Sequence, residues 1–145
     1  MIGISDGISF LSGVALGAAG KYFADKYTDQ RRKQEQTREE SREFREVSLK
    51  MPKLIVEMAA DVAGPTTPHV RDLVLMPSKG VTYNSDGQEV FLYYEEDHPN
   101  LRGQFAILEN HGYVADVTSG NVPIYRATEE FIQHLRQFQP NGLLA

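Results

Sequence analysis

The hydrophobic and polar positions divide the chain into an apolar beginning, a charged middle and a mixed remainder. Residues 7–20 read GISFLSGVALGAAG and carry no charge. Residues 28–43 then contain no large apolar side chain, and apolar residues return with helical spacing from Phe44 onward. This pattern predicts an N-terminal Gly-rich helix, a solvated helical stalk and one folded domain.

The apolar beginning has the length of a marginal membrane span. As a helix, residues 2–24 would extend about 34 Å, compared with about 30 Å for the hydrocarbon core of a bilayer. The side chains expected to insert are its larger apolar ones: Ile8, Phe10, Leu11, Val14, Leu16 and Phe23. Tyrosines, lysines and arginines follow, as at a positive-inside boundary. We therefore predict a single-pass membrane anchor over residues 1–24, with the C-terminus in the cytoplasm.

Small side chains recur at every fourth position of this segment, at Ser9, Gly13 and Gly17. This spacing favours close packing of a second helix, and hence a possible homo-oligomer. A secretory signal peptide is disfavoured because the first six residues contain Asp6 and no Lys or Arg. The alternative to an anchor is a Gly- and Ala-rich helix buried in protein, within a cytoplasmic molecule.

Residues 25–47 form the charged stalk of this prediction. Opposite charges at helical spacing, such as Asp29 and Lys33, support a helix by about 0.2–0.5 kcal/mol per pair. The lack of large apolar side chains in residues 28–43 argues against an apolar coiled-coil seam there.

Residues 48–138 alternate helical and extended patterns, and residues 139–145 form a tail. The first predicted helix covers residues 51–63 and ends at Gly64-Pro65. Residues 69–76 are ambiguous: Pro68 suits a helix start, but the short run VRDLVLM favours a strand or short turn. Residues 78–89 are expected to form a loop, and residues 90–96 are expected to form a strand.

The second half of this domain has clearer signals. Leu101, Phe105 and Leu108 have helical spacing, and Gly112 is a typical helix stop. Residues 113–117 and 122–125 flank the turn-rich tetrad 118–121, which predicts a β-hairpin. Thr128, followed by two glutamates, is a good N-cap for a last helix.

This order of helix, hairpin and helix, with the sequences LENHGYV and IYRATEEFIQHL, resembles the second half of a MarR-like winged-helix domain over residues 101–135. The resemblance implies that residues 99–111 are the recognition helix, residues 118–121 the wing tip and residues 128–138 the closing helix. Residues 51–96 depart from the usual three-helix beginning. The predicted fold class is α+β, with the helix and stalk followed by a small winged-helix-like domain.

The charge distribution argues against nucleic acid as the partner. The net charge is −5, and residues 51–145 carry six basic against twelve acidic residues. The outward face of the candidate recognition helix has one cation and one anion, where a base-reading helix needs several donors and flanking cations. We expect the helix and hairpin to dock onto a protein instead. The candidate partner-binding residues are Arg102, Ala106, Glu109, Asn110, Ser119, Asn121 and Arg126.

The sequence shows no pattern typical of catalysis. There are no cysteines, and the four histidines lack the spacing of a metal site. Phosphate-binding and nucleophile-elbow motifs do not occur. We therefore predict no enzymatic activity, metal or cofactor. The expected function is that of a membrane-anchored adaptor or regulatory subunit that binds a protein partner. The alternatives are a DNA-binding transcription regulator that dimerises through its N-terminal helices, and a subunit of a larger soluble assembly.

Overall fold

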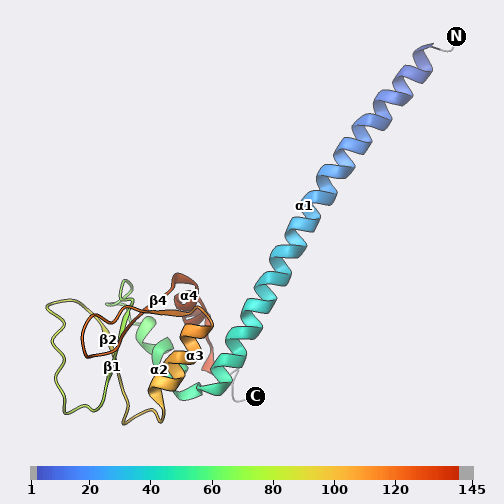
Figure 1. Cartoon of the computed structure of the whole chain (residues 1–145). Helices are drawn as coiled ribbons and strands as arrows, with labels where there is room; N and C mark the ends of the chain where they lie inside the picture. Colours follow the sequence, from blue (N-terminus) through green and yellow to red (C-terminus); the bar gives the residue numbers. More distant parts are fainter. Residues whose placement is uncertain (1–2, 141–145) are drawn as a thin grey trace. The chain divides into compact units, whose positions relative to one another are not determined.

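The computed structural model describes residues 3–140, and their side chains from Gly20 onward. In chain order the elements are α1 Gly3–Lys50, α2 Pro52–Val62, β1 Asp72–Met76, β2 Phe91–Tyr94, α3 Leu101–Asn110, β3 Val114–Asp116, β4 Ile124–Ala127 and α4 Glu129–Gln137 (Figure 1). The chain divides into two units, one ending at Arg42 and the other beginning at Glu43. The α+β fold class is thus confirmed.

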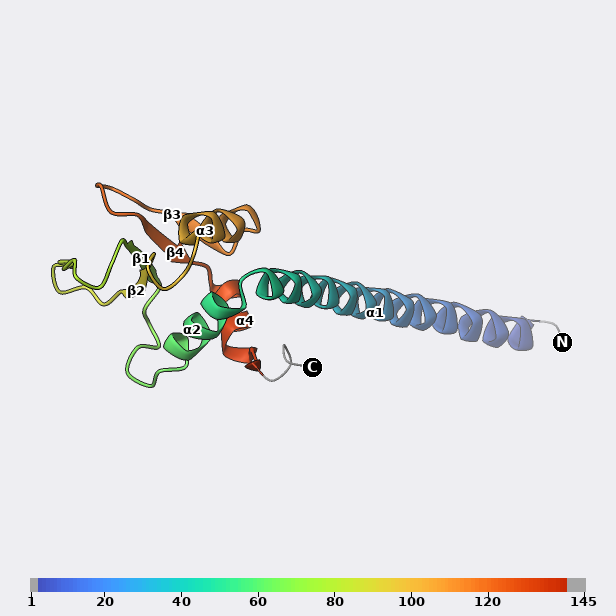
Figure 2. The ribbon, with the colours of Figure 1, turned by 90° about the horizontal axis from the view of Figure 1, so that it is seen from below.

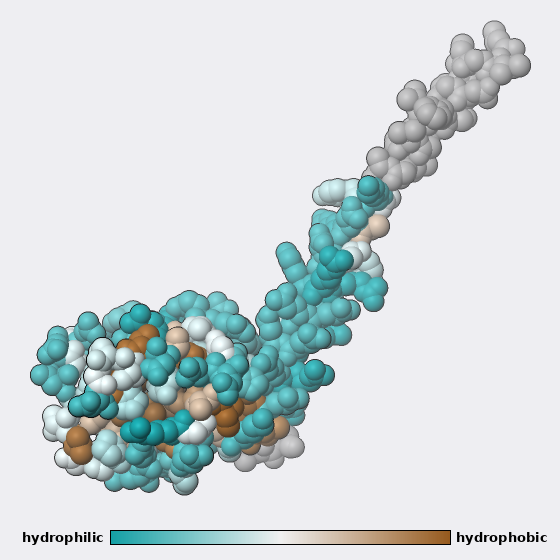
Figure 3. Space-filling model, in the orientation of Figure 1, coloured by the Kyte–Doolittle hydropathy of each residue, from teal (hydrophilic) through white to brown (hydrophobic). Residues whose placement is uncertain are grey.

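The first unit consists of the greater part of α1. The predicted helix over residues 25–47 is present, and its side chains from Gly20 to Glu43 are exposed to solvent, except for the half-buried Glu40. Figure 3 shows this length as largely hydrophilic. A surface of this kind depends on local pairs for its stability. One such pair joins the Gln36 amide, which donates a hydrogen bond, to the Glu40 carboxylate at 2.9 Å.

The predicted membrane anchor is wrong. In the part of the chain that the structure describes, no helix is both long enough and apolar enough to span a bilayer. The physical reason is composition, because glycine, alanine and serine contribute little to insertion and Lys21 follows directly. Of the anchor residues, Phe23 is 64% exposed. The side chains of Ile8, Phe10, Leu11, Val14 and Leu16, and of the packing residues Ser9, Gly13 and Gly17, lie outside the described residues.

The second unit is a four-stranded sheet in the order β2-β1-β4-β3, with helices on one face (Figure 2). β1 and β2 are parallel, with Leu73 opposite Phe91, whereas β4 is antiparallel to both β1 and β3. Fourteen residues, 77–90, connect the two parallel strands. A connection of about a dozen residues or more is what such a pair requires.

One hydrophobic core lies between the sheet and the helices. It takes Leu73 and Leu75 from β1 and Tyr93 from β2. The last turns of α1 contribute Phe44 and Val47, so the compact unit includes the end of the long helix. The other buried members of the core are Met51, Leu54, Ile55, Met58, Val62, Leu101, Phe105, Leu108, Tyr113, Val114, Ala127, Phe131, Ile132 and Leu135.

Local sequence signals account for most element boundaries. Pro52 occupies the first turn of α2, where its missing N–H costs nothing. Gly112 ends α3 at a φ of 75°, in the left-handed region that favours glycine. Thr128 caps α4 by accepting a hydrogen bond from the Phe131 amide at 3.2 Å. The predictions for α2, α3, the β3–β4 hairpin and α4 are confirmed, and the ambiguous residues 69–76 contain strand β1.

Candidate functional site

The outward face of α3 is the first part of the candidate site. Leu101, Phe105 and Leu108 are buried against the core. Helical periodicity therefore turns Arg102, Ala106, Glu109 and Asn110 to solvent, and all four are exposed. We call these four residues, together with Tyr125 of β4, the α3 surface.

Tyr125 joins α3 to the sheet at this surface. Its ring is half-buried, with its centroid 4.9 Å from that of Phe105. Burial raises the pKa of Tyr125, the negative charges of Asp116 and Glu109 raise it further, and Arg102 lowers it. The tyrosine ring thus lies within reach of charges from both α3 and β3. The surface combines an aromatic ring, a hydroxyl group and charges of both signs.

Arg102 is held by an acidic neighbour. Its Nε donates a hydrogen bond to Glu95 Oε1 at 2.7 Å, while 68% of the Arg102 side chain remains exposed. The rest of the acidic run 95–97 is also engaged. Glu96 accepts a hydrogen bond from the Lys79 amide, and Asp97 forms an ion pair with the Lys79 ammonium group. These contacts tie the end of β2 to residues at the start of the 77–90 connection.

The β3–β4 connection is ordered by its own hydrogen bonds. The Thr118 amide donates to Asp116 Oδ1, and the Ile124 amide donates to Thr118 Oγ1, each at 2.9 Å. The hydrogen bonds from Thr118 lower the pKa of Asp116. Ser119 and Asn121 lie between these bonds and are exposed. The connection thus presents short polar side chains on a fixed turn.

Arg126 is not part of the α3 surface. Successive side chains of a strand point to opposite faces, and Tyr125 and Ala127 face the core, so Arg126 faces the other side of the sheet. There its Nε donates to Asp72 Oδ1 at 2.9 Å. Arg126 therefore lies on a different face of the sheet from the four α3 residues, although all five were predicted from the sequence as partner-binding residues.

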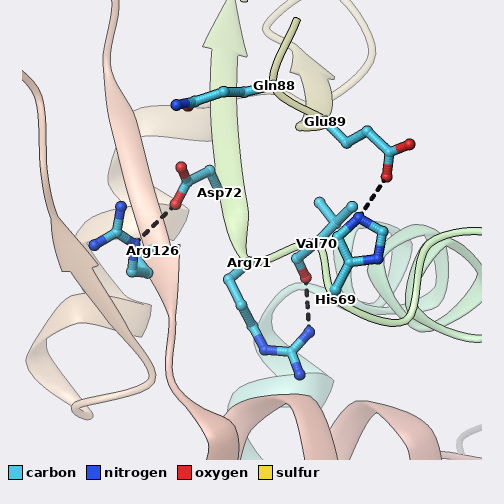
Figure 4. A pocket seen from close by; sticks show the side chains of 7 residues that line it. All are labelled: His69, Val70, Arg71, Asp72, Gln88, Glu89 and Arg126. Atoms are coloured by element: carbon cyan, nitrogen blue, oxygen red, sulfur yellow. Dashed lines mark hydrogen bonds and ion pairs between the residues drawn. The ribbon is translucent and has the colours of Figure 1, made fainter.

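Arg126 lines a polar hollow of about 370 Å³ (Figure 4). His69, Val70, Arg71, Asp72, Gln88 and Glu89 complete its lining. Its two arginines are paired, because Arg71 binds Glu129 at 2.7 Å and Arg126 binds Asp72 at 2.9 Å, and His69 Nε2 lies 2.8 Å from Glu89. The polar groups of the hollow are thus engaged with one another. With Arg102 and Arg126 on different sides of the sheet and each bound to an acid, the two arginines do not form one cationic surface.

A partly buried polar cluster links α2 to β2 and to His98 beyond it, and this cluster was not predicted from the sequence. Tyr93 Oη donates to Asp61 Oδ2 at 3.0 Å, and His98 Nε2 lies 2.5 Å from Glu57 Oε2. Burial raises the pKa of Asp61, the Tyr93 hydrogen bond lowers it, and the charge of Glu57 raises it. The sequence signal was the pair Glu57 and Asp61, one turn apart beside the apolar stripe of α2. Within the described residues, no group of three His, Asp or Glu side chains could hold a metal ion.

Comparisons with protein-family models, with curated proteins and with solved structures found no match to this chain.

Proposed function

We propose that this chain is a non-enzymatic protein-docking module, an adaptor or regulatory subunit, whose α3 surface binds a partner protein. The observation that carries the proposal is the arrangement around Tyr125. A half-buried tyrosine lies beside exposed charges of both signs on an ordered helix. Tyrosine and arginine are enriched among residues that dominate binding energy at protein interfaces.

The order α3, β3, β4, α4 supports treating this half of the unit as winged-helix-like. In that interpretation α3 takes the place of the recognition helix, and Ser119 and Asn121 lie at the wing tip. The same exposed helix and hairpin can bind protein in place of DNA, since a fold does not dictate a function. Protein is favoured here because Arg102 is bound to Glu95, while Arg126 lies on the other face of the sheet. A DNA-binding surface needs several cations directed at one duplex.

The experiment is affinity purification of the full-length chain, with quantitative mass spectrometry of the retained proteins. Ala106→Arg places a long charged side chain in the middle of the α3 surface, at an exposed position. Gln133→Arg is the matched control, because Gln133 is an exposed residue of a different helix, α4. We expect a partner that is retained by the wild type and by Gln133→Arg and is lost with Ala106→Arg. If Ala106→Arg retains the same proteins, the α3 surface is not the docking site.

A further inference from the structure

The exposed part of α1 carries a continuous line of uncharged side chains. The line consists of Phe23, Tyr27, Gln30, Gln34, Thr37 and Ser41, with spacings that alternate between four and three residues. We call it the uncharged seam. Fifteen of the 27 residues from 21 to 47 are charged, yet none of them occupies a seam position. A strict repeat of 3.5 residues is the period with which one helix follows another in a coiled coil.

The charges beside the seam are almost all positive. Its flanking positions hold Lys26, Arg31, Lys33, Arg38 and Arg45, with Glu40 as their one acid. The back of the helix is mainly acidic, with Asp25, Asp29, Glu35, Glu39, Glu43 and Glu46 against Lys21, Arg32 and Arg42. Flanking charges of this kind determine which helix pairs with which in coiled coils. The flanks of the seam therefore select a partner with negative charges.

The seam is accessible to solvent. Phe23 is 64% and Tyr27 62% exposed. The Thr37 hydroxyl donates a hydrogen bond to the Lys33 carbonyl at 2.8 Å, so its donor already has a partner within the helix.

The seam register continues into residues that the compact unit buries. One further step of three residues reaches Phe44, which is 7% exposed, and a step of four more reaches Ser48, which is 1% exposed. The heptad positions that the seam occupies between Phe23 and Ser41 are therefore filled by the buried residues Phe44 and Ser48 in the last turns of α1.

We propose that the uncharged seam of α1 docks a helix of a partner protein whose own flanking positions are acidic. The seam has no large apolar side chain between Tyr27 and Phe44. Apolar contacts along the seam therefore contribute little to the choice of partner, and charge pairing must supply the selectivity. This surface is separate from the α3 surface and does not depend on it.

Charge disfavours a second copy of the chain as the occupant. In a parallel pair, Lys26 would face Arg31 of the other copy, and Lys33 would face Arg38. Nucleic acid is disfavoured because the centre of this surface is an uncharged seam with the 3.5-residue period of a helical partner, and cations lie only at its flanks. Attraction to a phosphate backbone depends on cations at the contact itself. An acidic helix, in contrast, meets the cations at short range and leaves the acids of α1 on the far side.

The test measures binding of the full-length chain to two labelled synthetic peptides of four heptads each. The two peptides are identical at the positions that would face the seam of α1. The positions that flank these are all Glu in one peptide and all Lys in the other. By fluorescence anisotropy at low salt, we expect the Glu peptide to bind roughly tenfold or more tightly than the Lys peptide, with a difference that shrinks as salt is added. The triple variant Arg31→Glu, Lys33→Glu, Arg38→Glu should reverse this preference.

The matched control is Lys21→Glu, Arg32→Glu, Arg42→Glu, which changes the net charge equally on the back of the same helix. It should keep the wild-type preference, and circular dichroism should show equal helix content in both triple variants. Equal responses of the two triple variants, or no binding of either peptide, would overturn the proposal. The proposal would also be overturned if the wild type associates with itself, or binds duplex DNA more tightly than the Glu peptide. In either case the seam triple variant, and not the control variant, would have to abolish that binding. Any of these outcomes leaves the Ala106→Arg test of the α3 surface unaffected.

Discussion

Tyr93 donates its hydroxyl hydrogen to Asp61 Oδ2 across 3.0 Å and thereby links β2 to α2. The tyrosine is fully buried, and burial raises its pKa well above the ordinary value. The same contact places a carboxyl group at the edge of an apolar core, where the pKa of Asp61 is raised above its ordinary value of 3.8.

The raised pKa of Asp61 predicts that the free energy of unfolding falls as the pH rises. The folded state holds the Asp61 proton more tightly than the unfolded state does, so this contribution to stability is present below pH 3.8 and is lost as the pH rises through the folded pKa. Asp61→Asn removes the titration and preserves an acceptor for Tyr93. We expect the variant to gain stability relative to wild type as the pH rises from 3.8, measured by urea unfolding at several pH values.

Glu129→Gln is the control for this experiment because the pKa of Glu129 is shifted in the opposite direction from that of Asp61. The hydrogen bonds from Arg71 hold the pKa of Glu129 below its ordinary value of 4.5. Its contribution is therefore present above that value and is lost as the pH falls through the folded pKa. Parallel pH profiles for the two variants would contradict both assignments.

The structure predicts where a stable fragment must begin. Phe44 is in contact with the rings of Tyr113, Phe131, His134 and Phe138, and Val47 is fully buried. A fragment of residues 48–145 lacks both side chains, and their lost burial costs about 3–6 kcal/mol. We expect residues 43–145 to unfold cooperatively, and residues 48–145 to melt at a clearly lower temperature by circular dichroism. Equal melting temperatures would show that the end of α1 adds nothing to the core.

Asn100 and Gly103 are coupled at the start of α3. Asn100 has a φ of 57°, and a Cβ added to Gly103 would lie 2.3 Å from the Asn100 side-chain nitrogen. Gly103→Ala alone should therefore gain less than the usual helix propensity of alanine, because the Asn100 side chain must first move away. In an Asn100→Gly background the obstruction is gone, and alanine should stabilise the helix by the full amount of about 0.5–1 kcal/mol. A double-mutant cycle by urea unfolding measures this difference, and strict additivity of the two substitutions would refute the coupling.

The Thr128 hydroxyl connects two elements. Its oxygen accepts from the Phe131 amide, and its hydrogen is donated to the Tyr113 carbonyl at 3.2 Å. Thr128→Ala should cost about 1 kcal/mol of unfolding free energy, as for other lost N-caps. Thr128→Ser retains the hydroxyl and should recover most of that loss. A serine variant as unstable as the alanine variant would indicate that the methyl group matters, and not the cap.

The elements that could be predicted are those with local signals. The spacing of Leu101, Phe105 and Leu108, the stop at Gly112 and the cap at Thr128 each act within one or two turns of chain. The two faces of β4 were also readable, since alternation alone separates Arg126 from Tyr125. The anchor prediction failed because an uncharged segment was treated as an apolar one.

The remaining features depend on residues that are distant in sequence. The parallel pairing of Leu73 with Phe91 has no local signature, because it is defined by the sheet and not by either strand. The contact between His98 and Glu57 spans 41 positions, so its partner could not be identified from the sequence around it. The uncharged seam, in contrast, was present in the sequence throughout. It became evident once the helix and its exposure were known.

The length of chain between β1 and β4 has a consequence for the order of folding. Strands β3 and β4 with helices α3 and α4 are neighbours along the chain, so their contacts close short loops and can form early. Strand β1 must close a connection of 47 residues, 77–123, before its pairing with β4 contributes any stability, and β2 joins the sheet through β1. We therefore expect the C-terminal half to nucleate folding and β1 and β2 to join late, so that substitutions in these two strands mainly accelerate unfolding.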